Sequence, residues 1–508
     1  MKKTFKFFMC AAIVAAGFTA CSDEVTPIPG GGDNGNGNTP ELTGEPTYAT
    51  FRFDDGRQQA TTRSLDPDNA ENVAIEQLRV FIFDGASPTG ADVAQVDTTV
   101  TSNIVTIYLP TSGNKQIFVV ANDIASNLVP KATLTYGTLN AVIDVDTKLQ
   151  NISKVRRVAD GLFMLSNRTD SCNFTLTAGV EEADSQNPTS SNYIEINVRR
   201  TIAKLAVTQT QTSFTTVDGE GEVTNPSFRM WNVYKNINSI FTGASGFLIG
   251  SALDDTTALQ SDYGYRVGTG PTHDAFATVP TNITVRPTAA GQYYYMTENL
   301  RTVTNSSDYN YRNTTYAAIR ATYAPKTGFH FNTITSFTNV GNKFVIPATT
   351  VDATAGQSFW RVDSIPLGYE GLPLKALITS KDMVKQIVYH FKNPGLTSLV
   401  SVATAASITD AQIAEFFVEY INGQAWYRMD IGEGTMDAGN ASNPYANYKL
   451  GVERNAAYWA NITGYQTLGE PREGDLVGPN KPIVNGPTYL TVTVNVIPWY
   501  EAAGSGII

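Results

Sequence analysis

The chain has 508 residues, which is too long for a single hydrophobic core, so we expect two or three domains. Hydrophobic residues make up 42% of the chain and charged residues only 16%, a balance typical of extracellular β-rich proteins rather than helical cytoplasmic enzymes. The formal net charge is −11, and no cluster of Lys and Arg is large enough to neutralise a row of phosphates, which argues against a nucleic-acid partner.

The N-terminus has the layout of a secretory leader. Three lysines lie within the first six residues, an apolar stretch follows at 7–18, and small residues precede Cys21. This arrangement resembles a bacterial lipoprotein signal, although Phe18 replaces the usual aliphatic residue. We therefore predict a signal peptide over 1–20 and acylation of Cys21, for example with palmitate, which would hold the precursor on a membrane at about 0.8 kcal/mol per buried methylene. The alternative is an ordinary signal peptide with an incidental cysteine.

A tether and a first strand follow the leader. The tract at 30–38 is rich in Gly and Asn and has nothing to bury, so we expect it to be flexible. The first strand candidate is 48–53, whose aromatic residues are Tyr48, Phe51 and Phe53. A polar stretch then leads to Arg63. The segment 21–63 is thus predicted to contain the tether and this strand.

Short apolar runs separated by turn residues recur through the rest of the chain. They lie at 78–83, 104–109, 116–121, 193–198, 202–207, 228–234, 292–296, 316–323, 458–463 and from 489 onward. Such short strands predict antiparallel sandwiches rather than a parallel sheet with crossover helices. We expect an all-β protein with two sandwich domains in tandem, over 64–215 and 216–508, divided within the polar stretch 209–225.

Two segments of the second domain carry apolar residues at helical spacing, 382–391 and 410–421. Thr409 precedes the second segment, and Gln412 follows three residues later, which is the pattern of a capping box. We predict a small helical insertion at about 380–423 on the periphery of the second domain.

The residues that catalysis or metal binding would need are scarce. There are three histidines, widely separated in the sequence, and the common nucleotide-binding, nucleophile-elbow and zinc-protease motifs are absent. His390 is expected on a helix face, and Cys172 as a small strand residue, which leaves no intrachain disulfide after processing. We expect no enzyme, no metal and no cofactor. Paired carboxylates such as Asp254-Asp255 or Glu181-Glu182 stay open as an alternative, because folding sets their separation.

Tyrosine-rich segments at 293–295 and 309–311 raise the possibility of a carbohydrate platform, since sugar faces stack on aromatic rings. Alternate side chains of a strand face opposite sides, so Tyr293 and Tyr295 would share one face and Tyr294 the other. We favour packing in the core and at its rim over a binding role.

Several segments together resemble the fimbrillins, or type V pilins, and among them the shaft subunits of minor fimbriae. The resemblance covers most of the chain apart from the helical insertion and some loops. The segments that carry it are Cys21 with its tether, 61–64 (Thr-Thr-Arg-Ser), 78–85 (Leu-Arg-Val-Phe-Ile-Phe-Asp-Gly), 118–122, 198–205, 452–458 and 492–499 (Val-Thr-Val-Asn-Val-Ile-Pro-Trp). Their order and relative spacing make the set moderately specific.

The resemblance implies two transthyretin-like sandwich domains, export as a lipoprotein, and cleavage by an arginine-specific protease at the outer membrane surface. Cleavage after Arg63, with Arg57 as the second choice, would leave a mature chain that begins at Ser64. It would release the anchor and the removable first strand with Tyr48, Phe51 and Phe53.

The replacement strand would come from the C-terminus of a neighbouring copy, in a head-to-tail filament at the cell surface. We expect 490–496 to stay in its own domain. The lent piece would follow Pro498, with Trp499, Tyr500, Ile507 and Ile508 as its anchors. Two alternatives stay open: a tip or accessory fimbrial adhesin, for which the helical insertion argues, and a glycan-binding surface lipoprotein.

Overall fold

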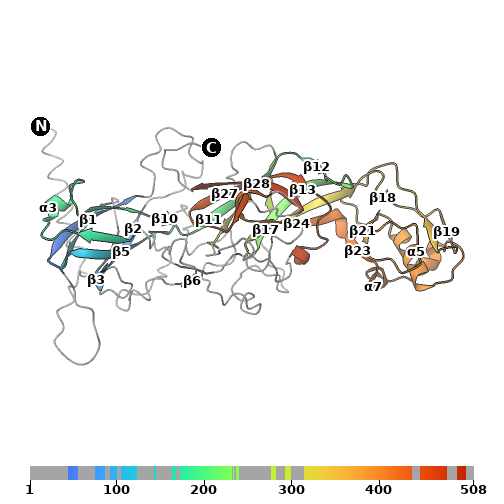
Figure 1. Cartoon of the computed structure of the whole chain (residues 1–508), viewed down its shortest axis with the longest axis horizontal. Helices are drawn as coiled ribbons and strands as arrows, with labels where there is room; N and C mark the ends of the chain where they lie inside the picture. The colour runs from blue at the N-terminus through green and yellow to red at the C-terminus, as the bar shows by residue number, and fades with distance from the viewer. Residues whose placement is uncertain are drawn as a thin grey trace, which may run out of the picture.

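The structure is a computed structural model. It describes residues 44–54, 75–85, 92–99, 104–122, 142–144, 163–167, 172–231, 233, 236–238, 276–281, 292–298, 314–436, 447–476 and 489–498. These residues form an elongated molecule, with a first β-sandwich at one end, a second sandwich in the middle and a mixed α/β insertion at the other end (Figure 1). The prediction of an all-β fold of two tandem sandwiches with a helical insertion in the second is confirmed.

The first sandwich packs a three-stranded sheet against a six-stranded sheet. The smaller sheet has the order β4 (Ile104–Leu109), β1 (Thr47–Asp54), β9 (Tyr193–Asn197). The larger has the order β10 (Arg199–Arg200), β7 (Leu165–Ser166), β5 (Gly113–Ala121), β2 (Gln77–Asp84), β3 (Asp92–Thr99), with β8 (Asn173–Leu176) paired to β5. Apolar side chains of both sheets meet in one core, in which Phe51 and Phe53 from β1 face Val80 and Ile82 from β2. The short helix α3 (Glu182–Ser185) lies over β1.

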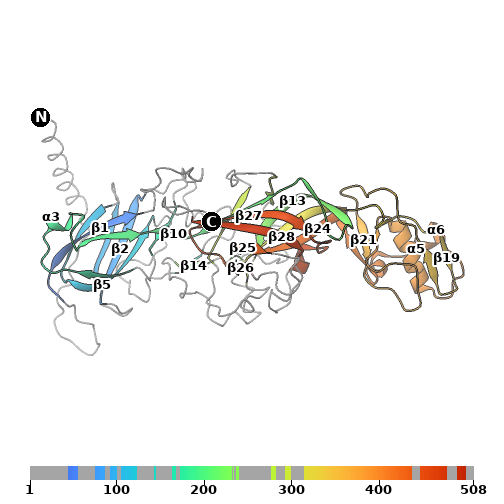
Figure 2. The same cartoon turned by 45° about the horizontal axis from the view of Figure 1, so that its top comes forward.

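The second sandwich is larger. One sheet has the order β16 (Tyr293–Met296), β11 (Ala203–Gln209), β27 (Ala456–Tyr465), β28 (Leu490–Pro498), β25 (Gly432–Met436), β26 (Asn447–Leu450). The other has the order β12 (Ser213–Thr215), β13 (Gly221–Trp231), β17 (Tyr316–Pro325), β24 (Gln424–Asp430), with β15 (Ala277–Thr278) paired to β13. Figure 2 shows β27, β28 and β25 side by side. A separate pair joins β6 (Val142–Asp144) to β14 (Asn236–Asn238).

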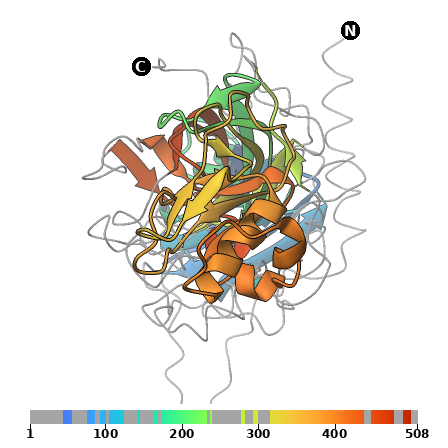
Figure 3. The same ribbon diagram turned by 90° about the vertical axis from the view of Figure 1, so that its right-hand side faces the viewer.

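The insertion has a hydrophobic core of its own. Its sheet has the order β18 (His330–Phe331), β22 (Leu377–Ile378), β21 (Phe359–Val362), β23 (Phe417–Tyr420), and a hairpin joins β19 (Ser336–Thr338) to β20 (Lys343–Val345). Its helices are α5 (Lys381–Lys392), α6 (Val402–Ala405) and α7 (Asp410–Ile413). Figure 3, seen from this end of the molecule, shows the helices in front of the sandwiches. The amphipathic helix α5 buries Val384, Ile387 and Val388 in the insertion core.

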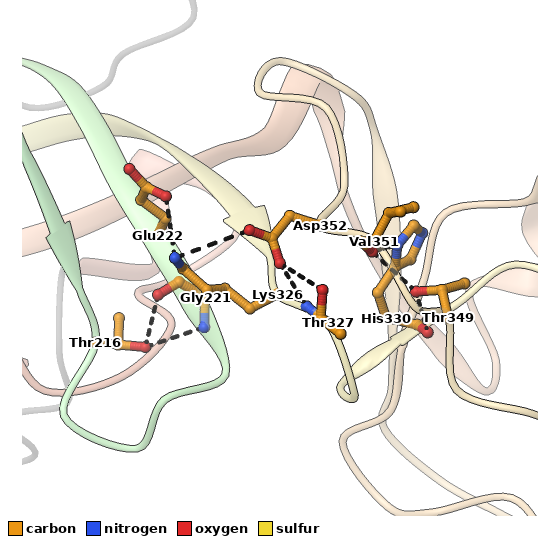
Figure 4. Close-up of polar contacts among 9 residues, drawn as sticks. All are labelled: Thr216, Gly221, Glu222, Lys326, Thr327, His330, Thr349, Val351 and Asp352. Carbon is orange, nitrogen blue, oxygen red and sulfur yellow. Dashed lines mark hydrogen bonds and ion pairs between the residues drawn. The ribbon is translucent and has the colours of Figure 1, made fainter.

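Shared strands and a polar cluster join the insertion to the second sandwich. In β21, Phe359 packs in the sandwich core, whereas the next residue, Trp360, packs in the insertion core. At the surface, Lys326 Nζ lies 3.2 Å from a carboxylate oxygen of Glu222 and 3.9 Å from one of Asp352 (Figure 4). Asp352 also accepts hydrogen bonds from Thr327, which lower the pKa of its carboxyl group. The continuous packing indicates that the insertion is fixed to the sandwich.

The structure differs from the helices predicted over 410–421. The capping box of Thr409 and Gln412 is present, but α7 ends at Ile413, and β23 follows. The reason is tertiary: β23 pairs with β21, and the ring of Tyr420 stacks on Phe359 at a centroid distance of 4.8 Å. Strand pairing and aromatic packing outweigh the local helical spacing. The insertion core also begins earlier than 380, since it includes Ile334.

Two further features of the topology depart from the expectation. The two cores divide between Val198, which packs in the first, and Ala203, which packs in the second, rather than at 215/216. The physical reason is that β11 pairs with β27 and β16 and so belongs to the second sandwich. The sheets are also not purely antiparallel, because β1 runs parallel to β9 and β11 runs parallel to β27.

Candidate functional site

The predicted removable strand, β1, is the central strand of its sheet. It pairs antiparallel with β4, where Tyr48 is opposite Tyr108, and parallel with β9, where Phe51 is opposite Ile194. Both edges of β1 are therefore hydrogen-bonded to strands that come much later in the sequence. A strand in this position completes the sheet, and without it the facing edges of β4 and β9 would lose their backbone partners.

One face of β1 supplies apolar side chains to the core. Ala49, Phe51 and Phe53 point into the first sandwich, and their exposed fractions are 0%, 0% and 1%. They pack with Leu109 of β4 and Ile196 of β9. Two fully buried Phe side chains stabilise the folded chain by about 1.5–3 kcal/mol each relative to exposure. The strand therefore contributes strongly to the core that it completes.

The other face of β1 is polar and lies beneath α3. Thr50 is fully buried, and its hydroxyl lies 3.0 Å from the hydroxyl of Thr106 and 3.0 Å from that of Ser185. Toward the end of the strand, Arg52 donates to Glu195 at 2.9 Å in a largely exposed pair, which contributes little to stability. Of the outward-facing positions 48, 50 and 52, position 50 is the one that is completely enclosed.

The N-terminal end of β1 is held by the side chain of Asn192. Its Nδ2 donates to Thr47 Oγ1 at 2.9 Å and to the carbonyl oxygen of Tyr48 at 2.8 Å. Thr47 Oγ1 also accepts from the backbone N–H of Val180 at 3.1 Å and donates to the carbonyl oxygen of Thr177 at 2.7 Å. Sequence reasoning missed these polar contacts, because only the fold brings Thr47 next to residues more than a hundred positions away.

The C-terminal strand expected to stay in its own domain is β28. It lies between β27 and β25, and Leu490, Val492 and Val494 are buried in the core of the second sandwich. The alternation of apolar and polar residues that predicted this strand therefore matches its two faces. The predicted donor residues lie outside the described residues; they are Trp499, Tyr500, Ile507 and Ile508. The acylation site Cys21 and the processing residues Arg57, Arg63 and Ser64 also lie outside them.

Two of the other candidates from the sequence are packed in the interior. Tyr294 belongs to the core of the second sandwich, and Tyr295 on the opposite face is also buried. The ring of Tyr293 contacts that of Tyr295 at a centroid distance of 5.4 Å, so these two share a face as expected. This packing leaves no open platform at 293–295 for a sugar ring. Cys172 is buried directly before β8, whereas Glu181 and Glu182 are exposed.

The two described histidines are structural. His390 lies on α5 with its ring 4.0 Å from that of Phe337, measured between centroids, and its Nε2 accepts from the backbone N–H of Val400 at 3.4 Å. Burial lowers the pKa of His390 to about 4, so the neutral form is favoured. His330 is buried on β18 and contacts Thr379 through Nε2. His273, Asp254, Asp255 and 309–311 lie outside the described residues.

The described part of the chain contains no cluster of three or more His, Cys, Asp or Glu side chains arranged to hold a metal ion. Among the described helices, none has the length and apolar character needed to cross a membrane.

A family model matches part of the chain. Residues 418–503 match the model of the C-terminal part of fimbrillin, described as major fimbrial subunit protein type IV. This segment begins within β23 and extends past β28, so it contains five of the eleven strands of the second sandwich, β24 to β28. A comparison with curated proteins finds no match.

Solved structures of low sequence identity align over most of the chain. A fimbrilin from Porphyromonas gingivalis W83 is 13% identical, covers 90% of this chain and 98% of its own, and has a TM-score of 0.40. The tip fimbrial protein Mfa3 from Porphyromonas gingivalis, with a C-terminal truncation, is 12% identical, covers 90% of this chain and 99% of its own, and has a TM-score of 0.33.

Proposed function

We propose that the chain is a fimbrillin-family protein, on the match of residues 418–503, and that it is a shaft subunit of a surface fimbrium, matured by proteolysis and polymerised by donor-strand exchange. Its role is structural and needs no cofactor or catalysis. The precursor is exported, acylated on Cys21 and held at the outer membrane. An arginine-specific protease then cuts after Arg63, so that the mature chain begins at Ser64.

The single observation that carries this proposal is the central position of β1 in its sheet. Loss of β1 would leave two facing strand edges, β4 and β9, with a row of backbone donors and acceptors on each. It would also open the space that Ala49, Phe51 and Phe53 fill in the core. Such a groove offers an incoming strand both main-chain hydrogen bonds and apolar burial, which is the basis of binding by strand addition.

The incoming strand in this proposal is the C-terminal piece of the next copy, anchored by Trp499, Tyr500, Ile507 and Ile508. The placement of β28 supports it, because a strand held on both edges keeps the donor attached to its own subunit while the piece after Pro498 is lent out. Donor and acceptor surfaces differ, so the contact does not close on itself and produces a filament. Partners are copies of the chain and accessory fimbrial subunits.

The experiment that tests this function is mass spectrometry and N-terminal sequencing of the protein sheared from cells. We expect a polymer ladder whose subunits begin at Ser64. The Arg63→Ala variant should stay a membrane-held precursor, and Arg57→Ala is the matched control that should mature normally. A chain without 499–508 should be trimmed but form no ladder. Surface protein that still begins at acylated Cys21 and stays monomeric would refute the proposal.

The insertion favours a second candidate, a tip or accessory adhesin of the same family. It has its own core and stands at the end of the molecule away from the first sandwich (Figure 1). Antibody labelling of sheared fimbriae separates the two roles. Label along the whole filament indicates a shaft subunit, and label at one end only indicates a tip subunit.

A further inference from the structure

We propose that the acceptor groove recognises two hydroxyl groups of β1, those of Thr47 and Thr50. This inference rests on the proposed function and adds a preference: a strand with Thr or Ser at both positions, three residues apart, is held more tightly than a strand without them. The predicted donor 499–508 carries one Ser, Ser505, and no Thr, so it would form at most one of these contacts and be held less specifically than β1. The residues that read the strand are Ser185, Thr106 and Asn192, and all three belong to the part of the first sandwich that stays after β1 is removed.

The hydrogen-bond donors and acceptors around Thr50 fix a direction. Ser185 Oγ donates its proton to the carbonyl oxygen of Glu182 at 2.8 Å. A hydroxyl has a single proton, so toward Thr50 Ser185 can only accept. Thr50 therefore donates its proton to Ser185. Because Thr50 has then used its proton, the hydroxyl of Thr106 donates to Thr50. The result is a chain of hydroxyls that runs from β4 through the strand to α3.

This chain of hydroxyls is interrupted by any side chain without a hydroxyl at position 50. Thr50 and Ser185 are both fully buried, so water cannot replace the missing group at Ser185 without rearrangement. A Val at this position keeps the shape of Thr but leaves the acceptor lone pair of Ser185 unsatisfied. A larger side chain would have to displace Ser185 of α3, whose hydroxyl oxygen lies 3.0 Å from that of Thr50. The site therefore selects for chemistry as well as for size.

Asn192, which contacts Thr47, is held in position by the acceptor itself, without β1. Its Oδ1 accepts from the backbone N–H of Thr177 at 2.8 Å, a bond that lies within the acceptor and persists without β1. The two protons of Nδ2 are shared among three oxygen atoms: the carbonyl oxygen of Thr177 at 2.9 Å, the carbonyl oxygen of Tyr48 at 2.8 Å and Thr47 Oγ1 at 2.9 Å. The contacts with Thr177 direct Nδ2 at the incoming strand. The contact at Tyr48 uses a backbone carbonyl oxygen, which any residue would supply. The contact at Thr47 needs a side-chain hydroxyl.

Recognition of two hydroxyl groups three residues apart also fixes the register of the strand in the groove. A slip by one residue would turn the apolar residues of the strand to the outer face and the hydroxyl away from Ser185. A slip by two residues would keep the faces but place position 52 or 48 under α3, and in β1 these are Arg52 and Tyr48. Polar recognition therefore supplies the specificity that apolar burial alone does not.

The test is a strand-exchange assay on the full chain. The chain is folded with β1 in place and is then cut at a protease recognition sequence inserted between β1 and β2. Fluorescent peptides with the sequence 44–54 are added in mild urea, and their incorporation is followed by anisotropy. Five peptides are compared: the native sequence, Thr50→Ser, Thr50→Val, Thr47→Ser and Thr47→Val.

We expect the native and the two Ser peptides to enter with similar affinity, and each Val peptide to bind roughly tenfold more weakly. In a chain that carries Ser185→Ala, the difference in affinity between the native and the Thr50→Val peptides should fall to about twofold, because the hydroxyl that accepts from Thr50 is absent. The matched control host is Ser364→Ala, which removes an exposed hydroxyl in the insertion that also donates to one carbonyl oxygen. This control chain should keep the roughly tenfold difference in affinity between the native and the Thr50→Val peptides.

Equal binding of all five peptides would overturn this inference and leave the proposed function intact. Discrimination that survives in the Ser185→Ala host would overturn the assignment of Ser185. Failure of every peptide to enter, including the native one, would overturn the proposed function as well, because the groove would then not accept a strand.

Discussion

Truncation of Phe51 tests how far the first sandwich depends on β1 in the uncut chain. Phe51 is fully buried between the two sheets, so Phe51→Ala removes a complete aromatic side chain and leaves a cavity. Substitutions of this kind cost about 3–5 kcal/mol. A domain of ordinary stability has only about 5–15 kcal/mol in total, so the first sandwich should become marginal.

The four described tryptophans, at 231, 360, 426 and 459, lie outside the first sandwich, so their fluorescence does not report on it. Hydrogen exchange read by mass spectrometry does, because peptides from β2 and β5 sample the first core and peptides from β17 and β27 sample the second. We expect Phe51→Ala to lower the protection of the first set by the equivalent of about 3–5 kcal/mol and to leave the second set unchanged.

Tyr48→Ala is the matched control, since Tyr48 lies on the outer face of the same strand and is only half-buried. Tyr48→Ala should lower the hydrogen-exchange protection of β2 and β5 clearly less than Phe51→Ala does. The reasoning is refuted if the two variants lose the same protection, or if Phe51→Ala lowers the protection of both sandwiches equally.

Three further predictions concern buried and strained positions. Because the pKa of His390 is about 4 in the folded state, below its ordinary value near 6.5, the unfolded chain binds more protons between these values, and stability falls as pH falls through that window. Urea unfolding should show that the free energy of unfolding is lower at pH 4 than at pH 7 by up to about 3 kcal/mol, and that His390→Gln reduces this difference. The same pH dependence in that variant would contradict the assignment to His390. Lys115→Ala removes the ammonium that lies 2.5 Å from the buried carboxylate of Asp84, and denaturation should show a loss of about 3–5 kcal/mol, whereas a loss below about 1 kcal/mol would count against a role for this pair. Gly371→Ala should destabilise the insertion by at least about 2 kcal/mol more than Gly395→Ala in thermal unfolding. The backbone angle φ is positive at both glycines, but a Cβ at Gly371 would clash with the carbonyl oxygen of Phe344, whereas a Cβ at Gly395 would meet open space. Equal effects of the two substitutions would exclude the clash.

The sequence by itself determined eleven of the 28 strands in the described part of the chain, because a period of two in apolar residues has a direct physical meaning. The run at 104–109 corresponds to β4 with the same bounds, and 490–496 lies within β28. The helix at 382–391 and the cap at Thr409 were equally readable, since spacing and capping are local properties. The fimbrillin resemblance, too, came from segments that can be read along the chain.

Only the tertiary structure decided which strands are neighbours. Nothing local in 48–53 indicates that β1 lies between β4 and β9, or that it runs parallel to β9. The same is true of the hydroxyls of Thr106 and Ser185, which meet Thr50 from positions 56 and 135 residues away. Strand pairing also converted 417–420 from predicted helix to strand. Pairing and burial between distant segments are collective properties of the folded chain, and for this reason the candidate site became visible only once its two edges were in place.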